Sequence, residues 1–261
     1  METIINVDDV SFSYGMQTEQ ALSHISLSVN KGDFIGIIGP SGAGKSTLVA
    51  CLSGAVPHHY TGAFYGSVLV DGHDTCEVSL TDISQIVGSV LQDIDTQMVA
   101  SVVEDEMLFG LENFGVPHDQ IEQHVSETLK TVGISDLRDR EIATLSGGQK
   151  QKVAIAAILA MRPRVLVLDE PTAALDPASS TLVFETLREA NRALGITIVV
   201  VEQKVALLSE YCNRVLVLDH GQIALQGEPH EVFARTDELR TIGVDCPRVT
   251  RIFNSLEADG L

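Results

Sequence analysis

The sequence predicts an α/β fold, in which a mostly parallel sheet is accompanied by an N-terminal antiparallel β subdomain and an inserted helical subdomain. Three observations support this prediction. Apolar runs of strand length recur along the chain between helical patterns. Residues 3–14 and 22–29 alternate between apolar and polar side chains, which is typical of antiparallel strands. Residues 93–145 instead carry apolar side chains at helical spacing, which indicates helices.

A glycine-rich loop follows the apolar strand 34–38. It fits the pattern G-x-x-x-x-G-K-[ST] and precedes a helical stretch, which is the context that a phosphate-binding loop requires. Glycines let backbone N–H groups close around phosphate oxygens, and the helix start adds the positive end of its dipole. Lys45 would reach the outer phosphates and Ser46 would hold Mg²⁺. The sequence therefore predicts a P-loop NTPase (RecA-like) core. The predicted nucleotide contacts in this loop are Gly39, Ser41, Gly42, Ala43, Gly44, Lys45, Ser46 and Thr47.

Acidic side chains end a second buried strand. Residues 164–170 form an apolar run that finishes in Asp169 and Glu170. A strand that is apolar on both faces belongs inside a parallel sheet, and ligands bind at the carboxyl ends of such strands. We therefore expect Asp169 to hold Mg²⁺ and Glu170 to orient or deprotonate an attacking water. Gln203 follows the buried strand 196–201 and is expected at the same edge.

Two further segments could contribute to nucleotide binding. An apolar helix begins with Ser146, Gly147, Gly148 and Gln149. A serine with two glycines at a helix start suits either anion binding or an ordinary N-cap. Tyr14 precedes the glycine loop, where its ring could stack on a purine or simply pack at a strand end. The residues alone leave both alternatives open in each case.

Composition places the chain among globular proteins and argues against a nucleic-acid partner. Hydrophobic residues make up 44% and charged residues 20% of the 261 residues, and the net charge is −19. A phosphate backbone requires a basic face, which so acidic a chain does not offer. The four cysteines form no C-x-x-C pair, which favours reduced thiols in a cytosolic protein over a zinc or redox site. The sequence shows neither a signal peptide at its start nor an apolar run of membrane-spanning length.

Together these segments resemble the nucleotide-binding subunit of ABC transporters. The resemblance covers about residues 3–230 and rests on several motifs in order along the chain. These are the phosphate loop 39–47, Gln92 at the Q-loop position, the signature 145–149, the Walker B run 165–170 and the D-loop 174–176. The resemblance implies an ATP hydrolase with ATP and Mg²⁺ as cofactors, adenine stacked on Tyr14, and Mg²⁺ near Ser46, Gln92 and Asp169.

Two short segments, residues 87–93 and 109–113, look more specifically like the ATPase of energy-coupling-factor (ECF) importers. This resemblance implies uptake of a vitamin or a transition-metal ion. It also implies a head-to-tail homo- or heterodimer of ATPase subunits, in which the loop 39–47 of one chain faces the helix start at 146–149 of the other. A transmembrane coupling subunit and a substrate-binding membrane subunit would complete the complex. The ATPase would then lie peripherally at the cytoplasmic face of the membrane.

Gln203 departs from the family pattern, which usually has a histidine at this switch position. Glutamine can hydrogen-bond to a γ-phosphate or a water, but it cannot accept a proton as imidazole does. Either Glu170 suffices while Gln203 only orients, which we favour, or this site is slow and a paired ATPase carries most turnover. The ATPase of a conventional ABC importer and, less readily, a soluble non-transport ABC ATPase are the alternative functions.

The sequence also predicts how the chain is divided. We expect an ATPase domain over residues 1–235, with the helical subdomain inserted at about 93–150. A peripheral C-terminal segment is expected over residues 236–261, since this stretch is mixed in pattern and acidic.

Overall fold

Two β-sheets form the body of the molecule in the computed structural model, which describes residues 2–16 and 18–247. In order across it, the larger sheet contains β10 (Gln222–Gly227), β9 (Arg214–Asp219), β3 (Phe34–Ile38), β8 (Thr197–Val201), β7 (Val165–Asp169) and β6 (Val87–Val90). The smaller sheet contains β2 (Leu22–Asn30), β1 (Thr3–Tyr14), β4 (Gly62–Val70) and β5 (His73–Asp74). Only β10 is antiparallel within the described part of the larger sheet. The predicted α/β fold with a mostly parallel sheet and an N-terminal antiparallel sheet is confirmed.

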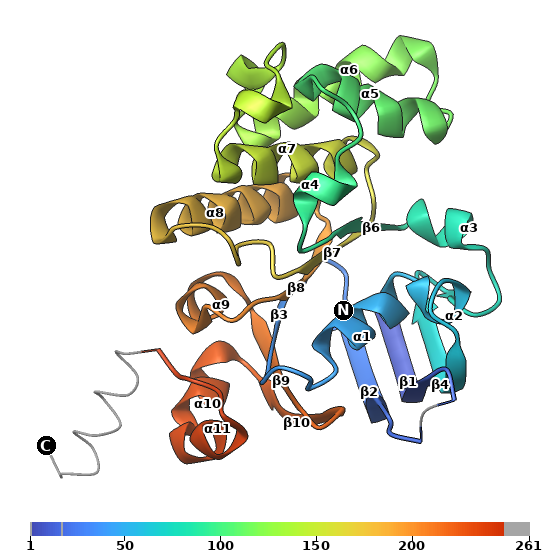
Figure 1. Ribbon diagram of the computed structural model, residues 1–261, viewed down its shortest axis with the longest axis vertical. Helices are drawn as coiled ribbons and strands as arrows, with labels where there is room; N and C mark the ends of the chain where they lie inside the picture. Colours follow the sequence, from blue (N-terminus) through green and yellow to red (C-terminus); the bar gives the residue numbers. More distant parts are fainter. Residues whose placement is uncertain (1, 17, 248–261) are drawn as a thin grey trace, which may run out of the picture.

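The helices form groups that Figure 1 separates clearly. α5, α6 and α7 stack at one end of the molecule, α8 lies below them, and α10 and α11 lie at the other end near β9 and β10. The α-helices are α1 (Lys45–Leu52), α2 (Ala55–His58), α3 (Leu80–Ser84), α4 (Ile94–Gln97), α5 (Val103–Asn113), α6 (His118–Val132), α7 (Gly147–Ala160), α8 (Pro177–Leu194), α9 (Val205–Tyr211), α10 (Pro229–Ala234) and α11 (Thr236–Ile242). Two short 3₁₀ helices are η1 (Ser135–Leu137) and η2 (Ile142–Thr144).

The central strands of the larger sheet are buried on both faces. Every residue of β3 and of β8 is buried. Side chains alternate along β3, so Phe34 and Ile38 enter the core shared with α7, α8 and α9. Ile35 and Ile37 enter a second core, which lies between this sheet, α1 and the smaller sheet. The apolar runs of the sequence therefore correspond to strands buried along their length, and the polar residues of the site lie where these strands end, at the edge of the sheet.

The smaller sheet extends further than the sequence predicts. The Gly-, Pro- and His-rich composition of residues 54–66 predicts a loop, but β4 already begins at Gly62. The backbone of Gly66 has φ 85°, and a Cβ there would lie 2.4 Å from the carbonyl oxygen of Asp8. The pairing of β1 with β4 shifts register just after Asp8. The prediction was wrong because a glycine that a strand irregularity requires resembles a loop signal in the sequence.

The helical insertion is divided into separate helices, since α6 follows α5 after a short turn and η1 follows α6. The apolar stripe of α6, at Ile121, Val125 and Leu129, is buried, which agrees with the helical spacing of apolar side chains in residues 93–145. The predicted end of the insertion falls inside α7, because this helix runs unbroken to Ala160 and packs against both α6 and α8. The division of the chain at about 93–150 and at 235 therefore stays a prediction.

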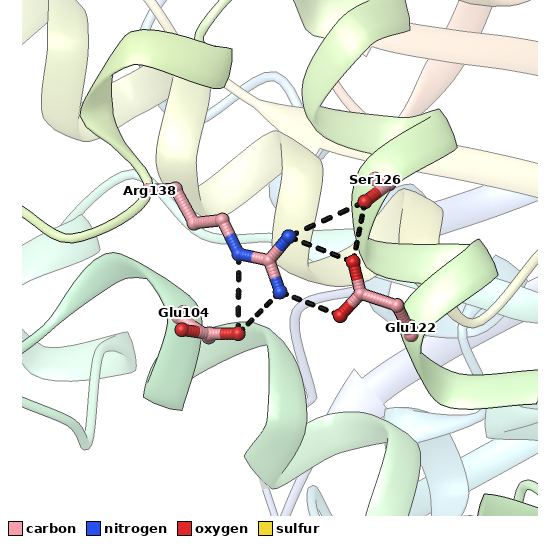
Figure 2. Close-up of polar contacts among 4 residues, drawn as sticks. All are labelled: Glu104, Glu122, Ser126 and Arg138. Carbon is pink, nitrogen blue, oxygen red and sulfur yellow. Dashed lines mark hydrogen bonds and ion pairs between the residues drawn. The ribbon is translucent and has the colours of Figure 1, made fainter. Parts of the chain in front are cut away.

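One arginine ties the two long helices of the insertion together (Figure 2). Nη2 of Arg138 donates to Glu104 of α5 at 2.5 Å and to Glu122 of α6 at 2.6 Å. Nη1 donates to Glu122 at 2.8 Å and to Ser126 at 3.3 Å. The hydrogen bonds from Arg138 and then Ser126 lower the pKa of Glu122 to about 2, and the two carboxylates raise the pKa of Arg138. The insertion is thus held by charge as well as by its apolar stripe.

The pair formed by Arg138 and Glu122 predicts an acid-sensitive contribution to stability. Because the folded-state pKa of Glu122 is about 2, below its ordinary 4.5, the pair contributes fully above pH 4.5 and is lost as the pH falls toward 2. We expect Glu122→Gln to lower Tm by at most a few degrees near neutral pH, since Glu122 is 68% exposed. The difference from wild type should shrink below pH 4.5. Thermal unfolding followed by circular dichroism at several pH values measures it, with exposed Glu112→Gln on α5 as the control. A deficit that does not change with pH would contradict the role of this pair.

The described part of the C-terminal segment packs on the body instead of lying at its periphery. Leu239 of α11 is fully buried, and Val244 and Cys246 are buried in the same core. These apolar residues stand among acidic and mixed residues in 236–261 and form no recognisable pattern, which is why the sequence suggests a peripheral position. Residues 248–261 of that segment lie outside the described residues.

Candidate functional site

The glycine loop lies between β3 and α1, at the edge of the larger sheet. α1 begins at Lys45, and its N-cap Gly44 has φ 97°. A Cβ at Gly44 would lie 2.5 Å from the carbonyl oxygen of Ala21, so both the backbone angle and the space require glycine. The first N–H groups of α1 and the positive end of its dipole therefore lie at the loop, as a phosphate site requires.

Lys45 is folded over this loop. Its Nζ donates to the carbonyl oxygens of Gly39 and Pro40, each at 2.8 Å, and the residue is only 7% exposed. Burial lowers the pKa of Lys45, whereas the charges of Glu170 and Asp169 act in the opposite direction. A buried cation thus lies between the glycine loop and the two acids, which is the position from which it could neutralise a phosphate.

Asp169 ends β7 beside Ser46 of α1. Burial raises the pKa of Asp169, while a hydrogen bond from Ser46 and the charge of Lys45 act to lower it. A hydroxyl and a carboxylate together fit Mg²⁺, which takes few protein oxygens and completes its shell with phosphates and water. No group of three or more His, Cys, Asp or Glu in residues 2–16 and 18–247 could enclose a metal ion. The Ser46 hydroxyl and the Asp169 carboxylate supply part of a ligand shell, which suits a metal that arrives with a nucleotide.

Glu170 and Gln203 are in direct contact, as their predicted shared edge requires. Nε2 of Gln203 donates to Oε1 of Glu170 at 2.7 Å. Glu170 has a left-handed backbone with φ 48°, and its N–H donates to the carbonyl oxygen of Val201 at 2.9 Å. The ends of β7 and β8 thereby fix the carboxylate and its amide neighbour together. This arrangement can orient a carboxylate toward a water that attacks a bound phosphate.

Two charged residues beside Gln203 also belong to the site, although the sequence predicts a role for neither; Glu202 is expected only to lie at the same edge as Gln203. Glu202 is 1% exposed, and its carboxylate accepts hydrogen bonds from the Thr172 hydroxyl and from the N–H groups of Gln203 and Lys204. Lys204 donates to the turn that follows Glu170. Glu202 directly follows a wholly apolar strand, and an acid at that position is the signal that could have revealed it, since buried charges persist only with partners.

Tyr14 lies beside the phosphate loop and packs against aromatic neighbours. Its hydroxyl lies 3.0 Å from Oγ1 of Thr47, in the first turn of α1. Its ring meets Phe12 and Tyr60 edge to face, with centroids 4.8 and 6.0 Å away. Packing at the strand end is therefore present, and stacking on adenine stays a prediction that this position beside the loop allows.

Ser146 begins α7 with a reciprocal pair of hydrogen bonds. Its Oγ accepts from the N–H of Gln149 at 3.3 Å, and Oε1 of Gln149 accepts from the N–H of Ser146 at 3.0 Å. This capping box bears out the N-cap interpretation. It is compatible with anion binding, because the N–H groups of Gly147 and Gly148 have no carbonyl partner within the helix. Ser146 and Gly147 are exposed, so this helix start is accessible to a second subunit.

A hollow of about 250 Å³ joins several predicted residues at the sheet edge. Gln92, Gly147, Glu170 and Leu175 are among the residues that line it. Gln92 lies in the lining of this hollow, and its contact with Mg²⁺ stays a prediction. The hollow connects the segment after β6 with the start of α7 and with Glu170.

Comparison with known proteins establishes the family. The family model described as ABC transporter matches residues 22–173. The chain belongs to the ABC transporter ATPase family. It is 44% identical to a putative ABC transporter ATP-binding protein of Pyrococcus horikoshii, over 99% of this chain and 91% of that one. It is 38% identical to the energy-coupling factor transporter ATP-binding protein EcfA1 of Clostridium perfringens, over 100% of this chain and 92% of that one.

Solved structures agree with this assignment. The ATPase resembles cbiO1 from Clostridium perfringens, part of the ABC transporter complex cbiONQ, with 34% identity and a TM-score of 0.83 over 97% of this chain and 99% of that chain. It also resembles a dimeric ATP-binding cassette bound to ADP and Pi, with 25% identity and a TM-score of 0.72 over 86% of this chain and 98% of that chain. The chain is thus an ATP-binding ABC ATPase that energises a transporter.

ABC ATPases act as dimers and together with membrane subunits, which agrees with the predicted need for a second ATPase subunit. Of the helices described in residues 2–16 and 18–247, none combines the length and apolar character needed to cross a membrane.

Proposed function

We propose that this ATPase energises an importer of the energy-coupling-factor type, which takes up a vitamin or a transition-metal ion. Similarity to EcfA1 over the full length of the chain supports this assignment. The observation that carries the catalytic part is the contact of Gln203 with Glu170 at 2.7 Å, at the same sheet edge as Asp169 and Lys45. Hydrolysis is then coupled to transport because a second ATPase subunit binds against this edge of the sheet.

The residues of the site divide the work of hydrolysis. The backbone of the loop 39–47 and Lys45 bind the β- and γ-phosphates of ATP. Glu170 orients the attacking water and accepts its proton as the bond between the γ-phosphorus and the bridging oxygen breaks. Gln203 holds the Glu170 carboxylate in position, which is a role that an amide can fill without accepting a proton. Tyr14 stacks on adenine.

Mg²⁺ would be held by Ser46 and Asp169, with Gln92 approaching from the segment after β6, and would neutralise charge on the phosphate oxygens. The partly buried Asp169 remains a suitable ligand, because Ser46 and Lys45 oppose the rise in its pKa that burial causes. The protein thereby supplies only part of the ligand shell. We expect this ion to bind together with ATP and not before it.

The second half of each ATP site comes from another ATPase subunit bound head to tail. Ser146, Gly147, Gly148 and Gln149 of that subunit approach the phosphates held by the loop 39–47. Neither chain alone encloses its nucleotide, so ATP binding closes the pair and hydrolysis loosens it. The helical insertion grips a transmembrane coupling subunit, which in turn binds a substrate-binding membrane subunit. The ATPase therefore works at the cytoplasmic face of the membrane.

Co-purification from detergent-solubilised membranes of the source organism tests this assignment. The tagged, full-length ATPase should bring down a multispanning coupling protein and a separate, smaller membrane protein that binds the transported compound. Recovery of a permease that works with a periplasmic or surface binding protein would instead favour a conventional ABC importer. Recovery of ribosomes or DNA without any membrane protein would contradict the transport function.

A further inference from the structure

The turn that follows Glu170 is tied to the end of β8 by one ammonium group. Lys204 follows Gln203, and its three N–H donors are all engaged. They donate to the carbonyl oxygens of Thr172 and Leu175 at 2.7 and 3.0 Å and to the hydroxyl of Ser180 at 2.6 Å. An ammonium has three donors and no acceptor, so these bonds satisfy it completely. The turn is therefore linked at two points to the strand end that carries Gln203.

A second contact between the same segments comes from Glu202. Its Oε2 accepts from the Thr172 hydroxyl, while its Oε1 accepts from the N–H of Gln203 at 2.8 Å and of Lys204 at 3.2 Å. Thr172 is fully buried and Glu202 is 1% exposed. The hydroxyl of Thr172 therefore donates to Glu202, and the carbonyl oxygen of Thr172 accepts from Lys204. Charged partners in a buried setting make these bonds strong and directional.

The turn does not need Lys204 in order to form. Its own backbone closes it, since the N–H of Ala173 donates to Glu170 at 3.1 Å and the N–H of Leu175 donates to Thr172 at 3.0 Å. The start of α8 is capped by Asp176, whose carboxylate accepts from the N–H of Ser179 at 3.0 Å. What Lys204 adds is the connection between this turn and β8. Its contribution therefore concerns the relative position of the two segments.

We propose that Lys204 is a positioning residue for ATP hydrolysis, which acts by fixing the turn after Glu170 against the strand end that carries Gln203. The inference rests on the proposed role of Glu170. The carboxylate and the amide that touch at 2.7 Å come from these two segments, so a shift between them breaks that contact. Even a small shift should slow hydrolysis, because a reacting group misplaced by about 1 Å can lose about 100-fold in rate.

Lys204→Met in the assembled transporter tests this role, since methionine keeps much of the side-chain length and removes every donor. We expect kcat for ATP hydrolysis to fall about 10- to 100-fold, while KM for ATP changes less than about threefold. Lys204→Arg should recover part of the loss, because a guanidinium can again donate to several oxygens. Lys31→Met, at an exposed position where Lys31 pairs with Glu2, is the matched control and should leave kcat unchanged.

A double-mutant cycle with Gln203→Ala separates positioning from general stabilisation. If Lys204 acts through the contact between Gln203 and Glu170, the double variant should be scarcely slower than the Gln203→Ala variant alone. Effects on kcat that multiply, or an unchanged kcat in Lys204→Met, would overturn the proposal. A parallel loss of ATP binding and of Tm in that variant would also overturn it, since that pattern indicates a structural role. Failure of Glu170→Gln to reduce hydrolysis would instead remove the proposed function of the site.

Discussion

Glu170→Gln should lower the rate of ATP hydrolysis about 100- to 10,000-fold while ATP remains bound, which is the range that a general base contributes. Glutamine keeps the size of the side chain and its capacity to contact Gln203, but it cannot take a proton from water. Lys45, Ser46 and the glycine loop are untouched, so the affinity for ATP should persist. We therefore expect the variant to trap ATP and to hold the two ATPase subunits closed.

The rate of phosphate release from the purified transporter measures this effect, and the amount of retained ATP is determined after rapid removal of free nucleotide. Gln203→His is the informative companion, because it restores the residue that the family usually has and should keep activity within a few-fold of wild type. Wild-type phosphate release from the Glu170→Gln variant would refute the role of Glu170. A large gain in rate from Gln203→His would show that the native glutamine makes this site slow.

Lys45→Ala should weaken ATP binding about 100-fold, because removal of one partner of a buried charge pair costs roughly 2–5 kcal/mol. Lys45 is 7% exposed and is the cation that the glycine loop places next to the acids of the site. Without it, the phosphates of ATP would meet Asp169 and Glu170 with less compensating charge. At low ATP concentration the rate of hydrolysis should fall because fewer sites hold ATP. At saturating ATP the rate should still be lower, because kcat also falls.

Equilibrium titration with a fluorescent ATP analogue measures the loss of affinity. Lys31→Ala is the control, because this substitution also removes one lysine charge. Lys31 lies at an exposed position, where it pairs with Glu2. Tm of both variants shows whether the loop still folds without the hydrogen bonds that Lys45 donates to Gly39 and Pro40. Unchanged affinity in a folded Lys45→Ala variant would contradict phosphate binding at this loop.

Much of the fold follows from pattern, because its central strands are buried on both faces and therefore appear as uninterrupted apolar runs. The glycine loop could also be recognised, since Gly44 needs both its backbone angle and the absence of a side chain. The start of β4 could not, because Gly66 in a strand irregularity has the same composition as a loop. The same limit applies to α11, whose buried Leu239 stands among acidic residues.

The residues of the site that could be predicted from the sequence are polar residues that directly follow buried strands. Asp169, Glu170 and Gln203 follow buried strands, and parallel strands bring their carboxyl ends to one edge. Lys204 was not predictable as part of the site, because its acceptors include backbone carbonyls about thirty residues earlier, at Thr172. Sequence patterns carry no information on which carbonyl a flexible lysine will reach. Tertiary geometry alone reveals that connection.

The central claim is that ATP lies between the glycine loop of one ATPase subunit and the Ser146 helix start of its neighbour. An experimental structure of the transporter with the Glu170→Gln variant and ATP tests this most directly. We predict that Lys45 contacts the γ-phosphate while the equivalent serine–glycine helix start of the facing ATPase subunit contacts it from the other side. Ser146 of this chain should likewise face the nucleotide of its neighbour. A nucleotide bound by one subunit alone, with Ser146 open to solvent, would contradict the account.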